Sequence, residues 1–521
     1  MEYTGKTRFF SVLARDGGAR SGRVRTDHGA CDTPCFLPIA SDGGLRALSF
    51  GQARECGTRM VMANAWYVYR KAGPEVLERA GGAHGHIGWS GALFTDSGGY
   101  QVFSLRDNSK IGRDGVSFGE EALTPESVIE MQTRVGADIM SVLDDCAPFP
   151  AGRRRIEDAV KRTTRWARRC QAAHERIGRR YDYGQVLYGI VQGGAHGGLR
   201  RRSIQEVAAL DFGGYGIGGL SIGMPRAAIR EMTALTCEGL PDDRPRHLLG
   251  VGLPGQVLEG IEDGADTFDC VLPVRKGQRG IAYTRRGEVR YKAPQPDRLR
   301  DAPLDEACTC ATCQRHSREA LRLLFKSDKP RAGQLAAQHN IHFYHQIMAE
   351  ARAAIGAGRF AAYKTGFLQK WDAGEEGAPG PPAQRRPQVE RPREGGIKRK
   401  KAKPAEAAIG AASAQAESAK TEKDPGHAAI AHIKATANNT LVTITDPGGN
   451  VLCWASAGSC GFAGSRRSTV FAGRAVATKA GEEAVRRGVR EVEVRAKGAG
   501  DGLEGAIGGL EALGLSVRRS R

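Results

Sequence analysis

Eight short apolar runs recur along the first 371 residues, and each of them contains or ends in polar residues or glycine. Helix-like segments lie between several runs, and one of them begins at Thr124, which precedes Pro125 as a helix N-cap would. Continuous apolar runs are typical of buried parallel strands, so eight of them alternating with helices predict a (β/α)₈ barrel. The runs are FLPIAS (36–41), MVMANAW (60–66), LFTDSGG (93–99), IMSVLDD (139–145), VLYGIVQGG (186–194), YGIGGLS (215–221), HLLGVG (247–252) and TFDCVLP (267–273).

Polar side chains stand at the ends of four of these runs, at the barrel face where active sites form. They are Asp96, Asp144, Gln192 and Asp269. In TDSGGYQ (95–101) the strand passes directly into serine and glycine, which suits either a plain turn or a close approach of the backbone to a ligand. Asp96 and Asp269 could act as a pair, in which one carboxylate attacks a carbon and the other moves a proton. Two turn-forming or salt-bridged aspartates are the alternative.

The composition changes after Trp371. Segment 373–424 is rich in proline, glycine, alanine and charge and has almost no large apolar residue, so we predict a disordered basic linker. Apolar patterning returns in 425–521, where NTLVTITD predicts a strand, Pro447–Asn450 a hairpin turn and STVFAGRAVATKAGEEAVRRG an amphipathic helix. The chain is therefore expected to have three parts, 1–372, 373–424 and 425–521.

The chain is strongly basic, with a formal net charge of +19 and a pI of about 9.6. This balance favours a polyanionic partner, most simply a nucleic acid. No apolar run is long enough to span a bilayer, and the opening MEYTGKTRFF lacks the apolar centre of a secretory signal. We therefore expect a cytoplasmic protein that has no membrane partner and whose twelve cysteines are reduced.

Three of those cysteines form the strongest metal signal, CTCATC, with Cys308, Cys310 and Cys313. Three thiolates this close predict a zinc site, and reduced, unligated thiols are the alternative. The fourth ligand must come from elsewhere, and QHNIHFYHQ offers His339, His342 and His345. The spacing does not choose among the three, and we select His339. Four protein ligands would make one structural Zn²⁺ per chain.

The motifs TDSGGYQVFSL, GADIMSVLDDC, YGIVQGG, GIGGLSIG, LLGVG, FDCVLP and CTCATC…QHN occur in the order found in tRNA-guanine transglycosylases. Residues 8–371 resemble that family. The resemblance implies a TIM barrel with an inserted zinc subdomain near residues 300–345. It also implies a pentosyltransferase of queuosine biosynthesis, which replaces guanine at the anticodon wobble position of tRNA by a 7-deazaguanine. Members of the family often work as homodimers.

The resemblance also implies roles for individual residues. Asp269 resembles the nucleophile that attacks the ribose and forms a covalent tRNA–enzyme intermediate, and Asp96 resembles the general acid/base. No redox cofactor or catalytic metal is implied. The residues that would hold the base, by edge recognition, backbone contacts or stacking, are Tyr100, Asp144, Gln192, Gly219, Leu220 and Leu249. Those that would contact tRNA are Arg275, Lys276 and Arg279.

The pocket resembles that of bacterial members, with Cys146 and a branched residue, Ile222. Ile222 would fill space needed by the bulkier queuine, so 7-aminomethyl-7-deazaguanine is the favoured base. Several positions depart from the family pattern, and three of them in particular bear on substrate choice and tRNA fit. They are Tyr67, Met224 and Gln278.

Residues 427–517, and especially NNTLVTITD and GFAGSRRST, resemble the eleventh protein of the small ribosomal subunit. The resemblance implies a small α/β fold that binds ribosomal RNA. The alternative is that the cations of this module form only a solvated basic face. Two histories would explain why the modules are joined, a true fusion or an adjacent reading frame joined by sequencing error. The expected phosphate contacts are Arg466, Arg467, Arg474 and Lys479.

Two other functions remain open for the whole chain. A non-catalytic RNA-binding or ribosome-associated protein would carry the same basic charge. A transglycosylase acting on another nucleic-acid site would keep the same chemistry. The presence of both Asp96 and Asp269 favours the enzyme.

Overall fold

The computed structural model describes residues 9–98, 109–118, 121–220, 223–374, 428–436, 439–460, 462, 467–498 and 502–519. The chain divides into two compact units, Met1–Val389 and Glu390–Arg521. Most of the predicted linker lies outside the described residues, as do Tyr100, Ile222 and Arg466.

A closed parallel barrel forms the centre of the first unit. Its sheet has the order β4-β15-β14-β13-β12-β11-β7-β6-β5. The two end strands, β4 (Cys35–Leu37) and β5 (Ile39–Ala40), are separated only by Pro38. Because they are two halves of one extended segment, the sheet closes on itself as an eight-stranded barrel, which confirms the predicted fold class. The other strands are β6 (Met60–Asn64), β7 (Ala92–Asp96), β11 (Ile139–Ser141), β12 (Val186–Val191), β13 (Gly214–Ile217), β14 (Arg246–Leu248) and β15 (Thr267–Asp269).

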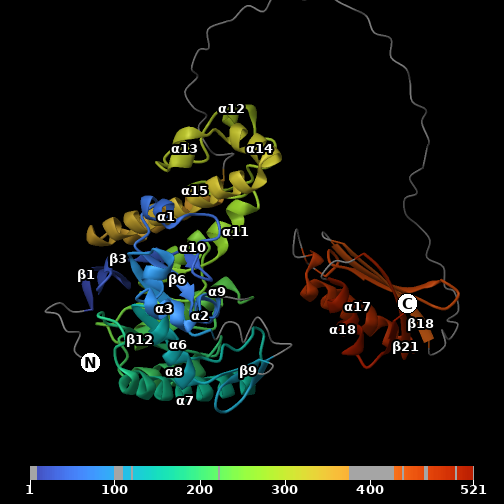
Figure 1. The fold of residues 1–521 in the computed structure, drawn as a ribbon. Helices are drawn as coiled ribbons and strands as arrows, with labels where there is room; N and C mark the ends of the chain where they lie inside the picture. Colours follow the sequence, from blue (N-terminus) through green and yellow to red (C-terminus); the bar gives the residue numbers. More distant parts are fainter. Residues whose placement is uncertain are drawn as a thin grey trace, which may run out of the picture. The chain divides into compact units, whose positions relative to one another are not determined.

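Helices surround this barrel (Figure 1). In α6 (Pro125–Val135) the Thr124 hydroxyl accepts the Ser127 N–H at 3.2 Å, and Gly136 ends the helix at φ 74°. The predicted N-cap is thus confirmed. The other helices that follow the barrel strands are α1 (Phe50–Glu55), α2 (Ala65–Ala72), α3 (Pro74–Arg79), α4 (Ala83–Ile87), α7 (Arg153–Ile177), α8 (Gly197–Ala208), α9 (Arg226–Gly239), α10 (Pro254–Glu262) and α11 (Leu272–Gln278).

An antiparallel sheet that the apolar pattern did not predict closes the N-terminal end of the barrel. Its strands are β1 (Phe10–Asp16), β2 (Ala19–Thr26) and β3 (Gly29–Thr33). Phe10 and Val24 pack in one buried cluster with Met60 and Ile139, the first residues of β6 and β11. The opposite, C-terminal end therefore remains for chemistry.

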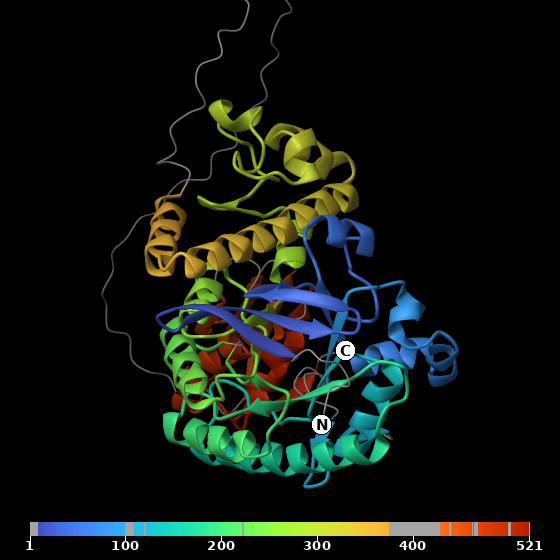
Figure 2. The same ribbon diagram turned by 90° about the vertical axis from the view of Figure 1, so that its left-hand side faces the viewer.

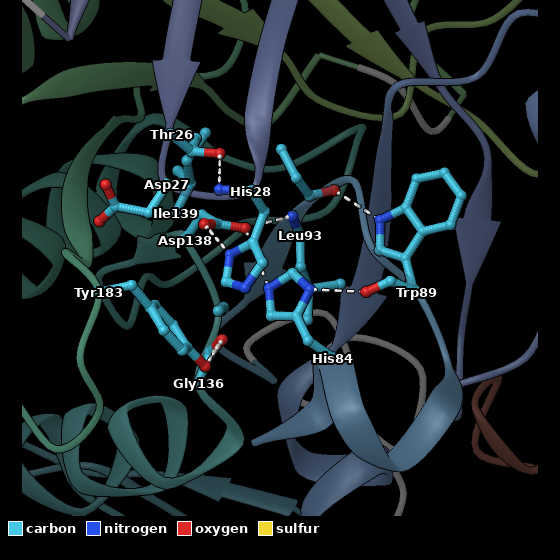
Figure 3. Close-up of polar contacts among 12 residues, drawn as sticks. Thr26, Asp27, His28, His84, Trp89, Leu93, Gly136, Asp138, Ile139 and Tyr183 are labelled. Atoms are coloured by element: carbon cyan, nitrogen blue, oxygen red, sulfur yellow. Dashed lines mark hydrogen bonds and ion pairs between the residues drawn. The ribbon is translucent and has the colours of Figure 1, made fainter. Parts of the chain in front are cut away.

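Three polar side chains fasten this sheet to the barrel (Figure 3). His28 lies between β2 and β3, and its Nδ1 donates to Asp138 Oδ1 at 2.7 Å. His84 Nε2 lies 3.1 Å from Asp138 Oδ2, which also accepts the Leu93 N–H at 2.7 Å. The two imidazole rings stack with centroids 3.5 Å apart and planes 12° apart. Lone pairs lie in the ring planes, so nearly parallel rings cannot aim them at one ion, and this geometry fits hydrogen bonding better than metal binding.

We expect Asp138→Asn to destabilise the first unit at neutral pH but not in acid. Burial opposes ionisation of Asp138, but hydrogen bonds from His28 and His84 outweigh it and lower the pKa of the carboxyl. A lowered pKa stabilises the fold above the unfolded value of about 4, and this contribution disappears as the pH falls through the folded value. Urea unfolding should give a loss of about 1–3 kcal/mol at pH 7 that shrinks below about pH 4. The exposed Asp182→Asn serves as the control, and a pH-independent loss would contradict this account.

A small subdomain caps the long helix α15 (Lys329–Gly356) on the side away from the barrel (Figures 1 and 2). Its apolar cluster includes Leu304, Leu321, Leu335 and the three cysteines of CTCATC. Its remaining elements, and the helix that follows α15, are β16 (Ala282–Thr284), β17 (Gly287–Val289), α12 (Asp297–Arg300), α13 (Ala311–Arg315), α14 (Arg318–Ser327) and α16 (Phe360–Ala373).

The second unit is a five-stranded sheet with the order β20-β19-β18-β21-β22. Alternate residues of β18 are buried, and they share one apolar cluster with α17 and α18. The predicted strand, turn and helix correspond to β19, the β19–β20 connection and α17, so the small α/β module is confirmed. The elements are β18 (Ala428–Thr436), β19 (Asn439–Thr445), β20 (Val451–Ser456), α17 (Val470–Arg486), β21 (Glu491–Lys497), α18 (Gly502–Glu511) and β22 (Ser516–Arg519). Among the helices described in both units, none is long and apolar enough to cross a membrane.

Candidate active site and metal centre

The polar residues predicted at strand ends all lie at the C-terminal mouth of the barrel. Asp96 ends β7 and Asp269 ends β15, while Asp144 and Gln192 follow β11 and β12. Gly219, Leu220 and Leu249 follow the two strands between β12 and β15. Parallel strands direct their C-terminal ends to one face, so these residues share one arc of the barrel rim.

Asp96 is held by the end of the neighbouring strand. Asn64 Nδ2 donates to Asp96 Oδ1 at 2.6 Å, and the Gly98 N–H donates to the same oxygen at 3.0 Å. Burial raises the pKa of Asp96 to about 6 against these two bonds, and the charge of Asp269 adds to the rise. A carboxyl that titrates near neutrality suits proton transfer in both directions.

Asp269 is held by two donors on one oxygen. The Gly250 N–H donates to Oδ1 at 2.8 Å, and His247 Nε2 lies 3.2 Å from the same atom. His247 is fully buried, and its Nδ1 lies 2.8 Å from the Thr267 hydroxyl. Because a carboxylate only accepts, His247 Nε2 donates to Asp269. Among the described residues no donor contacts Oδ2, which leaves that oxygen for attack.

Sequence reasoning missed both Asn64 and His247. Each is a polar residue inside an otherwise apolar run, Asn64 in MVMANAW and His247 at the start of HLLGVG. A polar side chain within a buried strand needs a hydrogen-bond partner, and here each partner is a candidate catalytic carboxylate. A polar residue inside an apolar run was therefore the sequence feature from which both residues could have been predicted.

Asp144 and Gln192 form a second polar pair beside the carboxylates. Gln192 Nε2 donates to Asp144 Oδ2 at 2.7 Å. Burial raises the pKa of Asp144 to about 7, and the negative charge of Asp96 also contributes. A Cβ on Gly218 or Gly219 would come within 2.6 or 2.5 Å of the Gln192 amide, so the glycines let the backbone lie directly against that side chain.

The remaining predicted site residues differ in their exposure to solvent. Leu220 is buried and Leu249 is half-buried. α11 starts three residues after Asp269, and both Arg275 on this helix and Arg279 at its C-cap are exposed. Lys276 Nζ lies 2.6 Å from Glu288 Oε1. In the second unit, the cations predicted to contact phosphate that lie among the described residues are exposed, and these are Arg467, Arg474 and Lys479.

The metal centre is assembled around His339. His339 Nδ1 lies 3.5, 3.6 and 3.3 Å from the sulfurs of Cys308, Cys310 and Cys313, and all four residues are buried. His339 Nε2 donates to the Tyr283 carbonyl at 2.6 Å, so the Nδ1 lone pair points at the thiols. Ligand atoms around a tetrahedral zinc stand roughly 3.5 Å apart, as follows from bonds of about 2.3 Å to sulfur and 2.0 Å to nitrogen. This site could hold a metal ion.

The two other histidines of QHNIHFYHQ face elsewhere. His342 Nε2 lies 3.2 Å from the Thr309 hydroxyl, and His345 Nε2 lies 2.8 Å from the Thr58 hydroxyl. The structure thus places His339 with the cysteines and directs its neighbours to hydroxyl partners.

Comparisons with known proteins found matches in both parts of the chain. Residues 16–373 match the family described as queuine tRNA-ribosyltransferase, and residues 429–521 match the family described as ribosomal protein S11. A queuine tRNA-ribosyltransferase of Symbiobacterium thermophilum is 40% identical over 375 residues, which span 70% of this chain and 92% of that protein. The protein of the same description from Thiobacillus denitrificans is 40% identical over 364 residues, which span 69% of this chain and 97% of the relative.

Proposed function

The chain belongs to the queuine tRNA-ribosyltransferase family, and from this premise we propose that it exchanges guanine at the tRNA wobble position for a 7-deazaguanine. The activity is that of a tRNA-guanine transglycosylase in queuosine biosynthesis. 7-Aminomethyl-7-deazaguanine is the favoured base. The observation that carries the proposal is the presence of two carboxylates, Asp96 and Asp269, at one mouth of the barrel, close enough for the charge of one to shift the pKa of the other.

Asp269 is assigned the nucleophilic step. Its Oδ2 attacks C1′ of the ribose, the bond from C1′ to N9 of guanine breaks, and the bonding pair leaves with the base. The products are a ribosyl ester of Asp269 and free guanine, which takes a proton from Asp96. The incoming base then gives up a proton to Asp96 and attacks C1′, which releases the Asp269 carboxylate. Two displacements retain the configuration at C1′, as in retaining glycoside hydrolases.

Base recognition is assigned to the pair of Asp144 and Gln192, with the backbone at Gly219 and Leu220. Guanine and its 7-deaza analogues present an N–H and an exocyclic amine along one edge, which suit carboxylate and carbonyl acceptors. A buried site built to satisfy such groups rejects bases that lack them by roughly 10⁴-fold or more. Leu249 is assigned to one face of the ring, and Tyr100, which lies outside the described residues, to the other.

Zinc is the metal we assign to Cys308, Cys310, Cys313 and His339. Three thiolates and one imidazole match the donor preference of Zn²⁺, and four protein ligands complete its tetrahedron. The ion would therefore be structural. It would join the CTCATC segment to α15, which also packs against α11, the helix that carries Arg275 and Lys276.

The domain organisation and the other partners of the chain are proposed from the families that its two parts match. We propose that the chain has a transglycosylase domain over 1–372, a linker over 373–424 and an RNA-binding module over 425–521. The match to ribosomal protein S11 supports RNA, with ribosomal RNA as one candidate, as the partner of the module. Phosphate contacts are proposed for Arg467, Arg474 and Lys479, tRNA contacts for Arg275, Lys276 and Arg279, and a cytoplasmic homodimer for the whole chain.

Base exchange is tested by incubating the purified full-length chain with unmodified tRNA and radiolabelled guanine. We expect label to enter those tRNAs that carry guanine at the wobble position, and unlabelled 7-aminomethyl-7-deazaguanine to displace it. Mass spectrometry of the digested tRNA identifies the inserted base. If tRNA binds but no label enters it, the chain is an RNA-binding protein and the proposed function is wrong.

A further inference from the structure

A buried arginine lies directly behind the proposed base-recognition site. Arg200 is on α8, and its side chain is fully buried. Its Nε and Nη2 donate to the Gly194 carbonyl at 3.2 and 3.1 Å, and Nη2 also donates to the Gly218 carbonyl at 3.0 Å. Nη1 reaches the Thr236 hydroxyl at 3.3 Å. One guanidinium thus ties together the loop after β12 and the end of β13.

This cation has no carboxylate partner within the described part of the chain, since its contacts are two carbonyls and a hydroxyl. Burial lowers the pKa of Arg200 to about 9, which reflects the cost of keeping an ion there. Buried charges are otherwise paired with an opposite charge or a metal. The same fold keeps Arg20 buried with Asp266 at 2.5 Å in the ordinary way. An arginine held by two carbonyls and a hydroxyl, with no carboxylate among its contacts, therefore needs a positional explanation.

Both carbonyls belong to segments that carry base-recognising groups. Gly194 follows Gln192 by two residues, and Gly218 precedes Gly219. Added Cβ atoms on Gly218 and Gly219 would collide with the Gln192 amide, so the two segments already touch at that side chain. The Ser203 hydroxyl, also on α8, lies 3.0 Å from the Gln192 N–H and accepts from it. α8 therefore contacts the Gln192 segment at two points, the N–H of Gln192 itself and the carbonyl of Gly194.

We propose that Arg200 is a specificity-determining positioning residue, whose planar fork sets the spacing between the Gln192 loop and the Gly218–Leu220 segment and so sets how tightly the exchanged base is bound. The inference rests on the proposed base exchange. Arg200 does not touch the base. It acts through the carbonyls of Gly194 and Gly218, and a lysine could not replace it, because one ammonium group lacks the rigid fork that meets both carbonyls at once.

The test compares Arg200→Gln and Arg200→Lys with Arg201→Gln, which alters the adjacent exposed arginine of the same helix. Initial rates of guanine exchange are measured twice, with guanine varied at saturating tRNA and with tRNA varied at saturating guanine. Because a KM does not depend on the amount of active enzyme, it can be measured on whatever folded fraction each variant provides. Thermal unfolding reports the stability of each variant separately.

We expect the KM for guanine to rise roughly 10- to 100-fold in Arg200→Gln, because a small misplacement of binding groups costs about that much. Arg200→Lys should give a smaller rise, and Arg201→Gln none. The KM for tRNA should stay within about twofold in all three. A merely structural role would lower the melting temperature and the apparent kcat while leaving both KM values unchanged, and that result would overturn the inference.

The outcome also separates this inference from the function on which it rests. A wild-type chain that exchanges no guanine refutes the proposed function. Exchange by the wild type together with an unchanged KM for guanine in both Arg200 variants refutes the role of Arg200 alone. Equal rises in the KM for guanine and for tRNA would mean that the whole mouth of the barrel is displaced, and this too would contradict a specific role in base binding.

Discussion

Replacing Asp269 with asparagine is expected to lower the rate of guanine exchange by on the order of 10⁴-fold or more. The amide keeps the shape of the side chain and its oxygen can still accept from Gly250 and His247. It has no carboxylate oxygen to attack C1′, so no ester can form. The measurement is incorporation of radiolabelled guanine into tRNA, with the exposed Asp297→Asn as a matched control that should keep the wild-type rate.

Trapping the intermediate separates nucleophilic attack from simple electrostatic assistance. Wild-type enzyme mixed with tRNA and quenched in denaturant should give a protein–tRNA adduct, and Asp269→Asn should give none. An adduct formed by Asp269→Asn and lost in Asp96→Asn would reverse the two assignments. An ester joins the ribose directly to the attacking side chain, so the loss of the adduct in one variant identifies the residue that attacks.

Cys310→Ser is expected to abolish metal binding and to lower the melting temperature of the full chain by at least roughly 10 °C. A hydroxyl is a poor zinc ligand, and structural zinc contributes about 10–16 kcal/mol of apparent binding free energy in small domains. The subdomain has only a small apolar cluster of its own, which includes the ligating cysteines. Metal analysis of the purified protein and thermal unfolding are the two measurements.

Cys56→Ser is the matched control for this prediction. Cys56 is also buried and donates to the Gln338 carbonyl at 3.5 Å, one residue from the ligand His339, but it is not in the ligand set. The Cys56→Ser variant should bind one metal ion per chain and retain most of the wild-type stability. Full metal content in Cys310→Ser would contradict the assigned ligands.

The apolar pattern was sufficient to predict the barrel and the face on which the candidate active site lies. Each barrel strand is a short run of buried residues, and that information is local in the chain. The polar residue that ends each run, such as Asp96 or Asp269, then falls at the C-terminal rim because all eight strands are parallel. The apolar pattern did not predict the N-terminal sheet because β1 is largely half-buried or exposed, and the buried residues of β2 include Arg20 and Ser21. Neither strand therefore carries a continuous apolar run.

The eight strands, the three clustered thiols and the acidic residues at the rim could all be predicted from the amino-acid order, since each depends on neighbours a few positions apart. The choice of the histidine that joins the thiols required the tertiary structure, because the Tyr283 carbonyl orients His339 across 56 residues of chain. Only it brought His247 against Asp269 and Arg200 against two loops. These contacts join side chains from separate strands and helices, and they exist only once the barrel has closed.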